Sequence, residues 1–171
     1  MTNSVKHIIN NYNAADIEPW DIETEYSHQK YIDKGFISTE DNAAFRTIVD
    51  ALKCFGLDYK GVWSGGINHP FYSDVLIWFP KLYSKGEWLN DINETENIIY
   101  EQNVDKQKNK DSLKAWLSAR RTKRIVFAYS KDSLGFTLYR FKGLFELDQE
   151  ATKLHERAVW RKTSETVETF K

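Results

Sequence analysis

Large aromatic side chains are concentrated in one short segment, VLIWFPKLYSKGEW, which spans Val75 to Trp88. Its aromatic residues are Trp78, Phe79, Tyr83 and Trp88. Successive residues of a β-strand point to opposite faces of a sheet, and here both faces would be apolar. Either the strand is buried on both sides, or one side forms an aromatic-lined site for a flat ligand. The sequence pattern fits both alternatives.

Positive charge is concentrated in the second half of the chain, although the net charge of the whole is only −1. Residues 101–147 contain 11 Lys and Arg against 5 Asp and Glu. Local clustering rather than the total determines the field at one surface. The segment is therefore either a solvated helix face with its loop or a patch that faces an anion such as a phosphate.

Residues that could carry catalysis form no recognisable pattern. The histidines are far apart and lack metal-ligand spacing, and there is neither a glycine-rich phosphate loop nor a nucleophile elbow. They are His7, His28, His69 and His155. Four carboxylates could in principle gather a divalent ion for nuclease chemistry: Asp74, Glu87, Asp91 and Glu94. A metal-dependent nuclease is thus the less favoured alternative, and we expect no metal, cofactor or catalytic residue.

A second alternative is a protein-binding role, as in a phage or mobile-element factor that acts on a host protein. An aromatic residue, Trp20, lies among acidic residues that could face a basic partner. The acidic residues are Glu18, Asp21, Glu23 and Glu25.

Length and composition predict a folded protein in a reducing compartment. A chain of 171 residues with 15% aromatic residues can bury a substantial core. Cys54 is the single cysteine, so the chain forms neither an internal disulfide nor a thiolate zinc site of its own. Neither a secretory signal nor a membrane-spanning stretch is visible, so we expect a cytoplasmic protein without a membrane partner.

Helical patterns dominate the first third of the sequence. Residues 4–12 form a short amphipathic pattern, and a second helical pattern within residues 21–36 ends at Gly35. The clearest helix is predicted over residues 38–56, where Ser38 or Thr39 can cap the start. Its apolar stripe comprises Phe45, Ile48, Val49, Leu52 and Phe55.

Strand patterns follow, interrupted by one basic helix. Residues 59–66 and 69–79 are predicted strands around a Gly-Gly turn, and residues 97–102 are a third. The basic helix is predicted over 108–121, with Ser112 as a possible cap. Residues 124–130 and 136–148 predict a hairpin, and residues 158–167 predict a last strand.

The second strand of this hairpin alternates between apolar and cationic residues. Tyr139, Phe141 and Phe145 are expected to be buried together, whereas Arg140 and Lys142 are expected to be exposed. Gly143 interrupts the strand, and a glycine there is typical of a bulge or a sharp bend. A small, strongly bent barrel explains this pattern best.

The closing strands resemble those of small PUA-like barrels, the group that includes SRA, ASCH, EVE and YTH domains. The resemblance covers roughly residues 59–170 and is carried mainly by WFPKLY and YRFKGLFELD. It implies a reader of modified or exposed nucleobases, in which the base is held between aromatic side chains. In prokaryotes such domains often accompany modification-dependent restriction enzymes.

The resemblance also implies which residues would form the site. The stacking surfaces would be Trp63, Trp78, Tyr83 and Trp88, and Asp74 could accept a hydrogen bond from an exocyclic amine. The phosphate contacts would come from Lys114, Arg120, Arg121, Lys123, Arg124, Arg140 and Lys142.

We therefore expect an α+β protein in which an N-terminal helical segment, residues 1–58, packs on a small, strongly curved, mostly antiparallel PUA-like barrel, residues 59–171. The two parts are expected to form one compact unit. The expected function is non-catalytic recognition of a modified or flipped base in DNA, or alternatively RNA. A separate nuclease or helicase is an expected partner, and cleavage would be the task of the nuclease.

Overall fold

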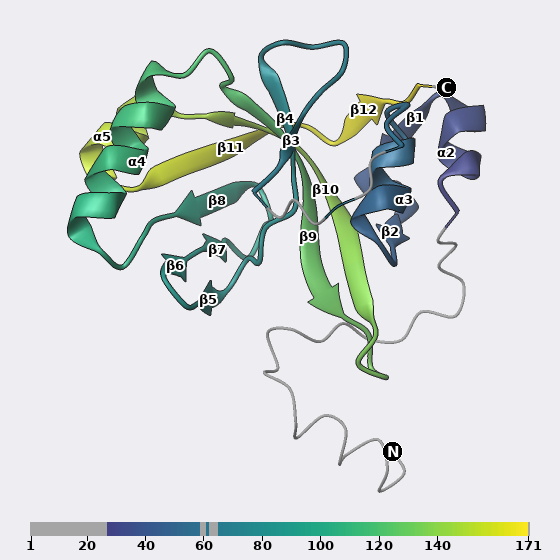
Figure 1. Cartoon of the computed structure of the whole chain (residues 1–171), viewed down its shortest axis with the longest axis horizontal. Helices are drawn as coiled ribbons and strands as arrows, with labels where there is room; N and C mark the ends of the chain where they lie inside the picture. Colours follow the sequence, from purple (N-terminus) through teal and green to yellow (C-terminus); the bar gives the residue numbers. More distant parts are fainter. Residues whose placement is uncertain (1–26, 59–60, 62–64, 171) are drawn as a thin grey trace, which may run out of the picture.

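The computed structural model describes residues 27–58, 61 and 65–170, and it has an α+β fold built around one mostly antiparallel sheet (Figure 1). In spatial order the strands of this sheet are β3 (Ile67–Asn68), β4 (Val75–Trp78), β9 (Lys123–Lys131), β10 (Thr137–Leu147), β11 (Ala158–Ser164), β8 (Ile98–Glu101) and β7 (Asp91–Ile92). A further strand, β2 (Ala44–Phe45), pairs with β10. Of these pairings, that between β4 and β9 is parallel. The α+β class and the predominance of antiparallel pairing are confirmed.

The predicted closed barrel is not detected among the described strands. The path of paired strands runs from β3 to β7 and does not return to its start. Both end strands are only two residues long, and each is paired along the path with a single neighbour. Strands this short offer little edge for the additional pairing that closure requires. The described sheet is therefore open.

Short strands and helices surround the sheet. The strands β1 (Phe36–Ser38) and β12 (Thr166–Glu168) pair with each other, as do β5 (Ser84–Lys85) and β6 (Trp88–Leu89). The helices are α2 (Gln29–Lys34), the 3-10 turn η2 (Thr39–Asp41), α3 (Ile48–Lys53), α4 (Lys106–Ser118) and α5 (Gln149–His155). Figure 1 shows α4 and α5 at one side of the sheet and α2 and α3 at the other. None of the described helices is long and apolar enough to cross a membrane.

The predicted helix over residues 38–56 is wrong in its first half. Ser38 does cap a helical turn, but η2 ends at Asp41, and the following Asn42 adopts a left-handed conformation with φ of 49°. Phe45 then lies in β2, where its backbone pairs with that of Tyr139 in β10. The α-helix begins only after Thr47, whose hydroxyl accepts a hydrogen bond from the Asp50 amide. Long-range pairing with β10 thus overrides the local helical pattern.

Several element boundaries differ from the prediction for local reasons. The helix over 4–12 lies outside the described residues, whereas α2 ends at Gly35 in a left-handed conformation as expected. The β3–β4 hairpin turns at residues 69–74 rather than at the glycine pair. His69 orders this turn, because its Nδ1 atom accepts hydrogen bonds from the amides of Phe71 and Tyr72. Helix α4 is capped by Asp105 rather than by Ser112.

The β9–β10 hairpin and the final strand are confirmed, and the hairpin contains the bulge expected at Gly143. Phe141 pairs with Phe127, but the next paired residue on β10 is Gly143, which faces Val126. Gly143 has a φ of +111°, and a Cβ atom there would lie 2.6 Å from the Ser164 carbonyl oxygen. Only glycine fits this combination without strain.

The bulge divides the core into two clusters, and this corrects the expectation that Tyr139, Phe141 and Phe145 are buried together. Phe141 belongs to the first cluster, against which the half-buried Tyr139 packs, and Phe145 belongs to the second. An extra residue reverses which face the following side chains point to. Arg140 and Lys142 are half-buried rather than exposed, since they bond to Asn42 and Glu96, respectively.

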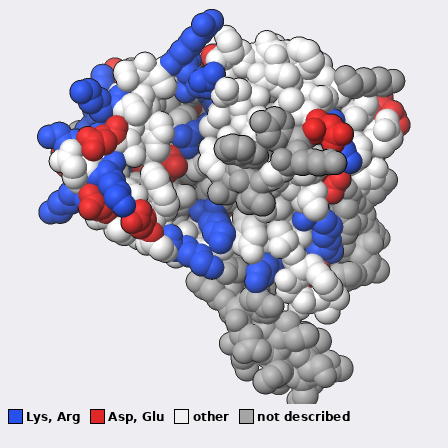
Figure 2. Space-filling view, in the orientation of Figure 1, with Lys and Arg blue, Asp and Glu red and all other residues white. Residues whose placement is uncertain are grey.

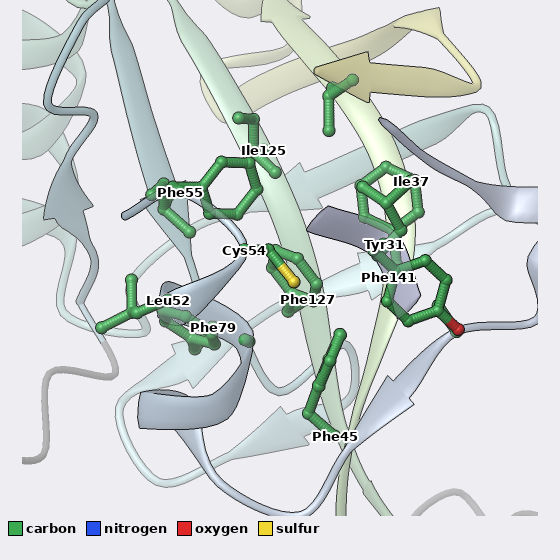
Figure 3. Close-up of a cluster of buried hydrophobic side chains, with 14 of the residues drawn as sticks. Tyr31, Ile37, Phe45, Leu52, Cys54, Phe55, Phe79, Ile125, Phe127 and Phe141 are labelled. Atoms are coloured by element: carbon green, nitrogen blue, oxygen red, sulfur yellow. The ribbon is translucent and has the colours of Figure 1, made fainter. Parts of the chain in front are cut away.

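The first cluster joins helices of the N-terminal segment to the central hairpin (Figure 3). Tyr31 of α2 and Leu52 of α3 are buried in it with Phe127 of β9. The second cluster brings together Trp78, Ile99, Val126, Phe145, Leu147, Ala158 and Trp160, with Trp116 and Leu117 of α4 packed against it. Because β4 and β9 contribute to both clusters, the sheet is covered on both faces where these strands run.

Candidate functional site

A cavity of about 740 Å³ lies where β4, β9 and β10 meet the β5–β6 hairpin and α4. Its lining residues are Gly65, Trp78, Phe79, Pro80, Lys81, Tyr83, Lys85, Trp88, Asn90, Glu101, Ser112, Trp116, Arg124, Tyr129 and Tyr139. The volume is within the range of cavities that hold small organic ligands, roughly 300–1,000 Å³. Aromatic residues with a few charged and amide groups are the composition typical of such a site.

Three tryptophans from separate elements line the cavity, Trp78, Trp88 and Trp116, and Trp160 packs against two of them. Trp88 of β6 and Trp116 of α4 have ring centroids 6.2 Å apart, and Trp116 lies 6.4 Å from Trp160 of β11. Trp78 of β4 is 4% exposed, whereas Trp88 is 36% exposed. The segment Val75–Trp88 thus combines the two alternatives left open by the sequence: β4 is largely buried, and the hairpin that follows it presents an accessible aromatic face.

Arg124 of β9 lies in the middle of this tryptophan cluster. Its guanidinium carbon lies 3.7 Å from the ring centroid of Trp160 and 4.2 Å from that of Trp78. Its Nη1 atom donates to Glu101 Oε2 at 2.7 Å, and Trp160 Nε1 donates to the same oxygen at 3.2 Å. Burial lowers the pKa of Arg124, and the adjacent Glu101 carboxylate opposes this shift. The cavity wall therefore contains a fixed and hydrogen-bonded ion pair.

Asn90 contributes an amide to the same wall. The residue is 8% exposed, and its buried Oδ1 atom has no hydrogen-bond partner among the residues that the structure describes. Buried polar atoms in folded proteins are nearly always hydrogen-bonded, so this exception in a residue that lines the cavity is a candidate ligand contact. Asn90 follows β6 directly, so the hairpin holds it beside Trp88.

Two lysines from the loop and hairpin after β4 also line the cavity. Lys81 lies with its ammonium nitrogen 4.7 Å from the ring centroid of Tyr129, and Lys85 is exposed on β5. With Arg124 and Glu101, these residues give the lining a positive balance. A site with this balance favours a ligand that brings negative charge close to the opening.

The structure brings together four of the residues singled out from the sequence: Trp78, Tyr83, Trp88 and Arg124. Trp63 lies outside the described residues. Asp74 does not line the cavity; its carboxylate accepts from Lys123 Nζ at 3.0 Å. This hydrogen bond holds the pKa of Asp74 below its ordinary value and that of Lys123 above it.

The other predicted phosphate contacts do not form one cluster with the cavity. Lys114 and Arg121 are exposed, and Arg120 donates to Ser73 at 3.1 Å. Arg140 donates to Asn42, and Lys142 forms an ion pair with Glu96. Figure 2 shows Lys and Arg side chains mixed with Asp and Glu side chains on the side of the molecule where α4 and α5 lie.

Sequence reasoning did not identify Asn90, Glu101, Trp116 or the two lysines as site residues. Asn90 and Glu101 carry no local signal, because each sits next to ordinary strand residues. Only the pairing of β8 with β11 brings Glu101 beside Trp160 and Arg124. Within the described residues no group of three or more His, Cys, Asp or Glu side chains could share a metal ion. The acidic segment around Trp20 lies outside the described residues.

Comparison with known proteins identifies a matching family and a similar solved structure. A family model described as "SET and RING associated domain" (SRA) matches residues 30–169. Among solved structures, the chain is similar to "The 5-Hydroxymethylcytosine-Specific Restriction Enzyme AbaSI", with 41% sequence identity and a TM-score of 0.80. The match covers 88% of this chain and 48% of the AbaSI chain, so this chain spans about half the length of that enzyme. The search of curated proteins found no match.

Proposed function

Because the chain belongs to the SRA domain family, we propose that it binds DNA and recognises a modified cytosine that has rotated out of the base stack into the cavity. The single observation that carries this proposal is the cavity of about 740 Å³ with Trp78, Tyr83 and Trp88 in its lining. The similarity to a restriction enzyme specific for 5-hydroxymethylcytosine supports the choice of base.

Stacking supplies the affinity of this site. A base that leaves the duplex loses its neighbours in the stack, and an aromatic face can replace them. Trp88 is the accessible face, because it is partly exposed and tilted by 44° against Trp116. Base–aromatic stacking contributes roughly 1–3 kcal/mol per base, which is enough to offset much of the unstacking cost.

Polar groups in the wall supply the selectivity. A carboxylate accepts a hydrogen bond from the exocyclic amine of cytosine. Since Asp74 lies outside the cavity, we assign this kind of contact to the buried Glu101 and to the unpartnered oxygen of Asn90. Arg124 and Trp160 hold the Glu101 carboxylate in place, so little ordering is needed when a base enters.

The cavity has room for a base that carries a substituent. Cavities of several hundred Å³ enclose drug-sized ligands, and an unmodified pyrimidine is much smaller than these. A hydroxymethyl group or a larger substituent at the cytosine C5 position would fill space that plain cytosine leaves open. Its hydroxyl could also donate to Asn90 Oδ1, the acceptor that the wall leaves unbonded.

We assign the contacts with the DNA phosphates to two groups of cationic side chains. Lys81 and Lys85 line the cavity and would meet the phosphates that flank the rotated nucleotide. Lys114, Arg120 and Arg121 are proposed to contact the duplex further along its axis, whereas the buried Arg124 is assigned to the cavity wall.

We propose that this chain recognises and does not cut. The restriction activity in the name of AbaSI belongs to a protein of which this chain matches 48%. Cleavage would then come from a separate nuclease, and DNA rather than RNA is the proposed partner. We further propose that residues 27–58 and the sheet act as one unit, because β1 pairs with β12 and Phe55 forms a bridge with Phe170.

The proposal is tested by equilibrium binding to duplexes that differ at one central base. We expect a duplex with 5-hydroxymethylcytosine to bind at least about tenfold more tightly than the same duplex with cytosine, since one well-read base is worth roughly 1–3 kcal/mol. A duplex with 5-methylcytosine is the matched control for the hydroxyl. Equal affinity for all three duplexes would overturn the proposal.

A further inference from the structure

A small pocket of about 220 Å³ lies on the face of the sheet opposite to the cavity. On β9 the neighbouring residues Arg124 and Ile125 point to opposite faces; Arg124 lines the cavity, whereas Ile125 lines the small pocket. On β4 Trp78 and Val75 are divided in the same way. A base bound in the cavity therefore leaves the small pocket free. The described residues that line it are His69, Tyr72, Val75, Ile125, Leu144, Ser164, Thr166, Val167 and Glu168.

A buried hydrogen-bond donor belongs to the small pocket. His69 lines it, is 5% exposed, and accepts at Nδ1 from the amides of Phe71 and Tyr72. Burial lowers the pKa of His69, although the Asp74 carboxylate opposes this shift, so the neutral ring is favoured. A neutral imidazole that accepts at Nδ1 carries its proton at Nε2. This buried Nε2 atom has no hydrogen-bond partner among the described residues, so it can donate to an acceptor that a ligand supplies.

Exposed aromatic rings adjoin the small pocket. Phe71 is 60% exposed and Tyr72 is 43% exposed, and both belong to the turn that His69 orders. The ring centroid of Phe170 lies 4.7 Å from that of Phe71 and 6.1 Å from that of Tyr72. Aromatic residues beside a pocket that accepts one side chain of a partner are typical of protein interfaces. The surface around the small pocket therefore fits another protein.

The size and the walls of the small pocket indicate which side chain it accepts. Its apolar wall comprises Val75, Ile125, Leu144 and Val167. An apolar cavity of about 150 Å³ can hold a benzene molecule, so this pocket has room for a branched aliphatic side chain such as that of leucine. A peptide backbone that delivers this side chain also brings carbonyl oxygens, which are the acceptors that His69 Nε2 lacks.

One carboxylate supplies the charge at the rim of the small pocket. Glu168 is the one charged residue among the described lining residues, and it is exposed. Its Oε2 atom accepts from the Tyr72 hydroxyl at 2.7 Å, which leaves its negative charge in place. Within the described part of the chain, no Lys or Arg forms an ion pair with it. A cationic side chain beside the aliphatic one would complement this carboxylate.

We infer that the small pocket docks a segment of a partner protein in which an aliphatic residue adjoins a Lys or Arg residue. The aliphatic side chain fills the pocket, a backbone carbonyl oxygen accepts from His69 Nε2, and the cation pairs with Glu168. The inference does not depend on the proposed function, because the small pocket and the cavity lie on different faces of the sheet. It gives the chain a place to hold another protein while the cavity is occupied.

Three short peptides test the inference on the full chain: acetyl-Arg-Leu-Arg-amide, acetyl-Arg-Gly-Arg-amide and acetyl-Gln-Leu-Gln-amide. The first should bind at least about tenfold more tightly than the second, because only leucine fills the pocket. It should bind about two- to fivefold more tightly than the third, because an exposed ion pair adds little. Glu168→Gln should remove this second difference while it keeps an acceptor for the Tyr72 hydroxyl. Binding is followed by NMR, and the ring-nitrogen resonances of His69 should shift.

A variant that covers the small pocket provides the control for location. Thr166 is exposed on β12 and lines the pocket, so Thr166→Trp should abolish binding of the Arg-Leu-Arg peptide. Thr163→Trp is the matched control, because Thr163 is exposed on β11 and lines neither the pocket nor the cavity. Tryptophan is favoured in strands, so neither variant should unfold earlier, and this is measured first. The comparison of the peptides on the unaltered protein stands even if a variant fails to fold.

Four outcomes would overturn the inference. They are equal affinity for the leucine and glycine peptides, equal affinity for the Arg and Gln peptides, binding that leaves the His69 resonances unchanged, and binding that survives Thr166→Trp. Sedimentation of the protein alone adds a further test. A dimer that Thr166→Trp dissociates would make a second copy of this chain the occupant of the pocket, and this result would also overturn the inference.

Discussion

The tryptophans of this protein differ in exposure although they lie within one cluster. Trp88 is partly exposed at the cavity, whereas Trp160 is 1% exposed and donates to Glu101. In our proposal the first binds the base and the second supports the Glu101 carboxylate. Residue type alone could not distinguish them, because both carry the same ring.

Alanine substitutions should separate these tasks. Trp88→Ala should weaken binding of a modified duplex by about 1–3 kcal/mol and leave stability nearly unchanged, because one stacking face is lost. Trp160→Ala should lower the free energy of unfolding by roughly 3–5 kcal/mol, because it leaves a cavity and removes a partner of Glu101. Urea denaturation and fluorescence titration measure the two effects. A large loss of stability in the Trp88 variant would mean that this residue belongs to the core.

Some of the residues that line the cavity could be predicted from the sequence. The aromatic segment was identified because runs of Trp and Tyr are visible in the sequence, whereas Arg124 was predicted as a phosphate contact and instead lies buried beside Glu101. Asn90 and Glu101 were not identified, because their importance comes from burial beside residues distant in sequence. The family resemblance implied Asp74 as an acceptor, but its carboxylate lies beside Lys123 instead.

Among the elements, the β9–β10 hairpin determines the architecture. Its bulge at Gly143 directs Phe141 into one cluster and Phe145 into the other, so one strand serves both faces of the sheet. The glycine signal in the sequence predicted this bend correctly, whereas the helical pattern over residues 38–45 was misleading. The bulge could be predicted because the need for a glycine is visible at a single position. The strand β2 could not, because it forms by pairing with β10, nearly a hundred residues away in the sequence.

Replacement of this glycine should be costly. Gly143→Ala introduces a Cβ atom that would lie 2.6 Å from the Ser164 oxygen, in a conformation that L residues rarely adopt. We expect a loss of roughly 1–3 kcal/mol or more in the free energy of unfolding, measured by denaturant titration. Gly65→Ala is the matched control, since a Cβ atom there meets nothing within 4 Å. Equal stability of the two variants would contradict the role assigned to the bulge.

At the scale of the whole molecule, function depends on how the charges are distributed. The net charge of −1 does not reveal a DNA-binding protein, and Asp and Glu side chains interrupt the Lys and Arg side chains on the side that carries α4 and α5 (Figure 2). The sequence suggested the broad PUA-like group on the pattern of its last strands, and the family match places the chain within the SRA family. Of the cations that the sequence predicted as phosphate contacts, only Arg124 lines the cavity. The other cationic residues in the lining are Lys81 and Lys85.

The salt dependence of binding should identify the true phosphate contacts. Lys81→Gln with Lys85→Gln should reduce the slope of log affinity against log salt by up to about 0.9 for each lost contact. Lys142→Gln is the matched control, because this lysine is already paired with Glu96. Binding is measured across a salt series with one modified duplex. A slope that changes only in the control would place the DNA on another face.

The most direct test of the central claim is whether the modified base leaves the stack when the protein binds. A duplex with 2-aminopurine next to 5-hydroxymethylcytosine reports this, because 2-aminopurine fluoresces strongly once its neighbour is gone. Our account predicts a rise in fluorescence on binding of the unaltered protein, a smaller rise with Trp88→Ala, and no rise with a duplex that carries plain cytosine. Tight and selective binding without any change in fluorescence would mean that the base is read inside the duplex, which would contradict the assignment of the cavity.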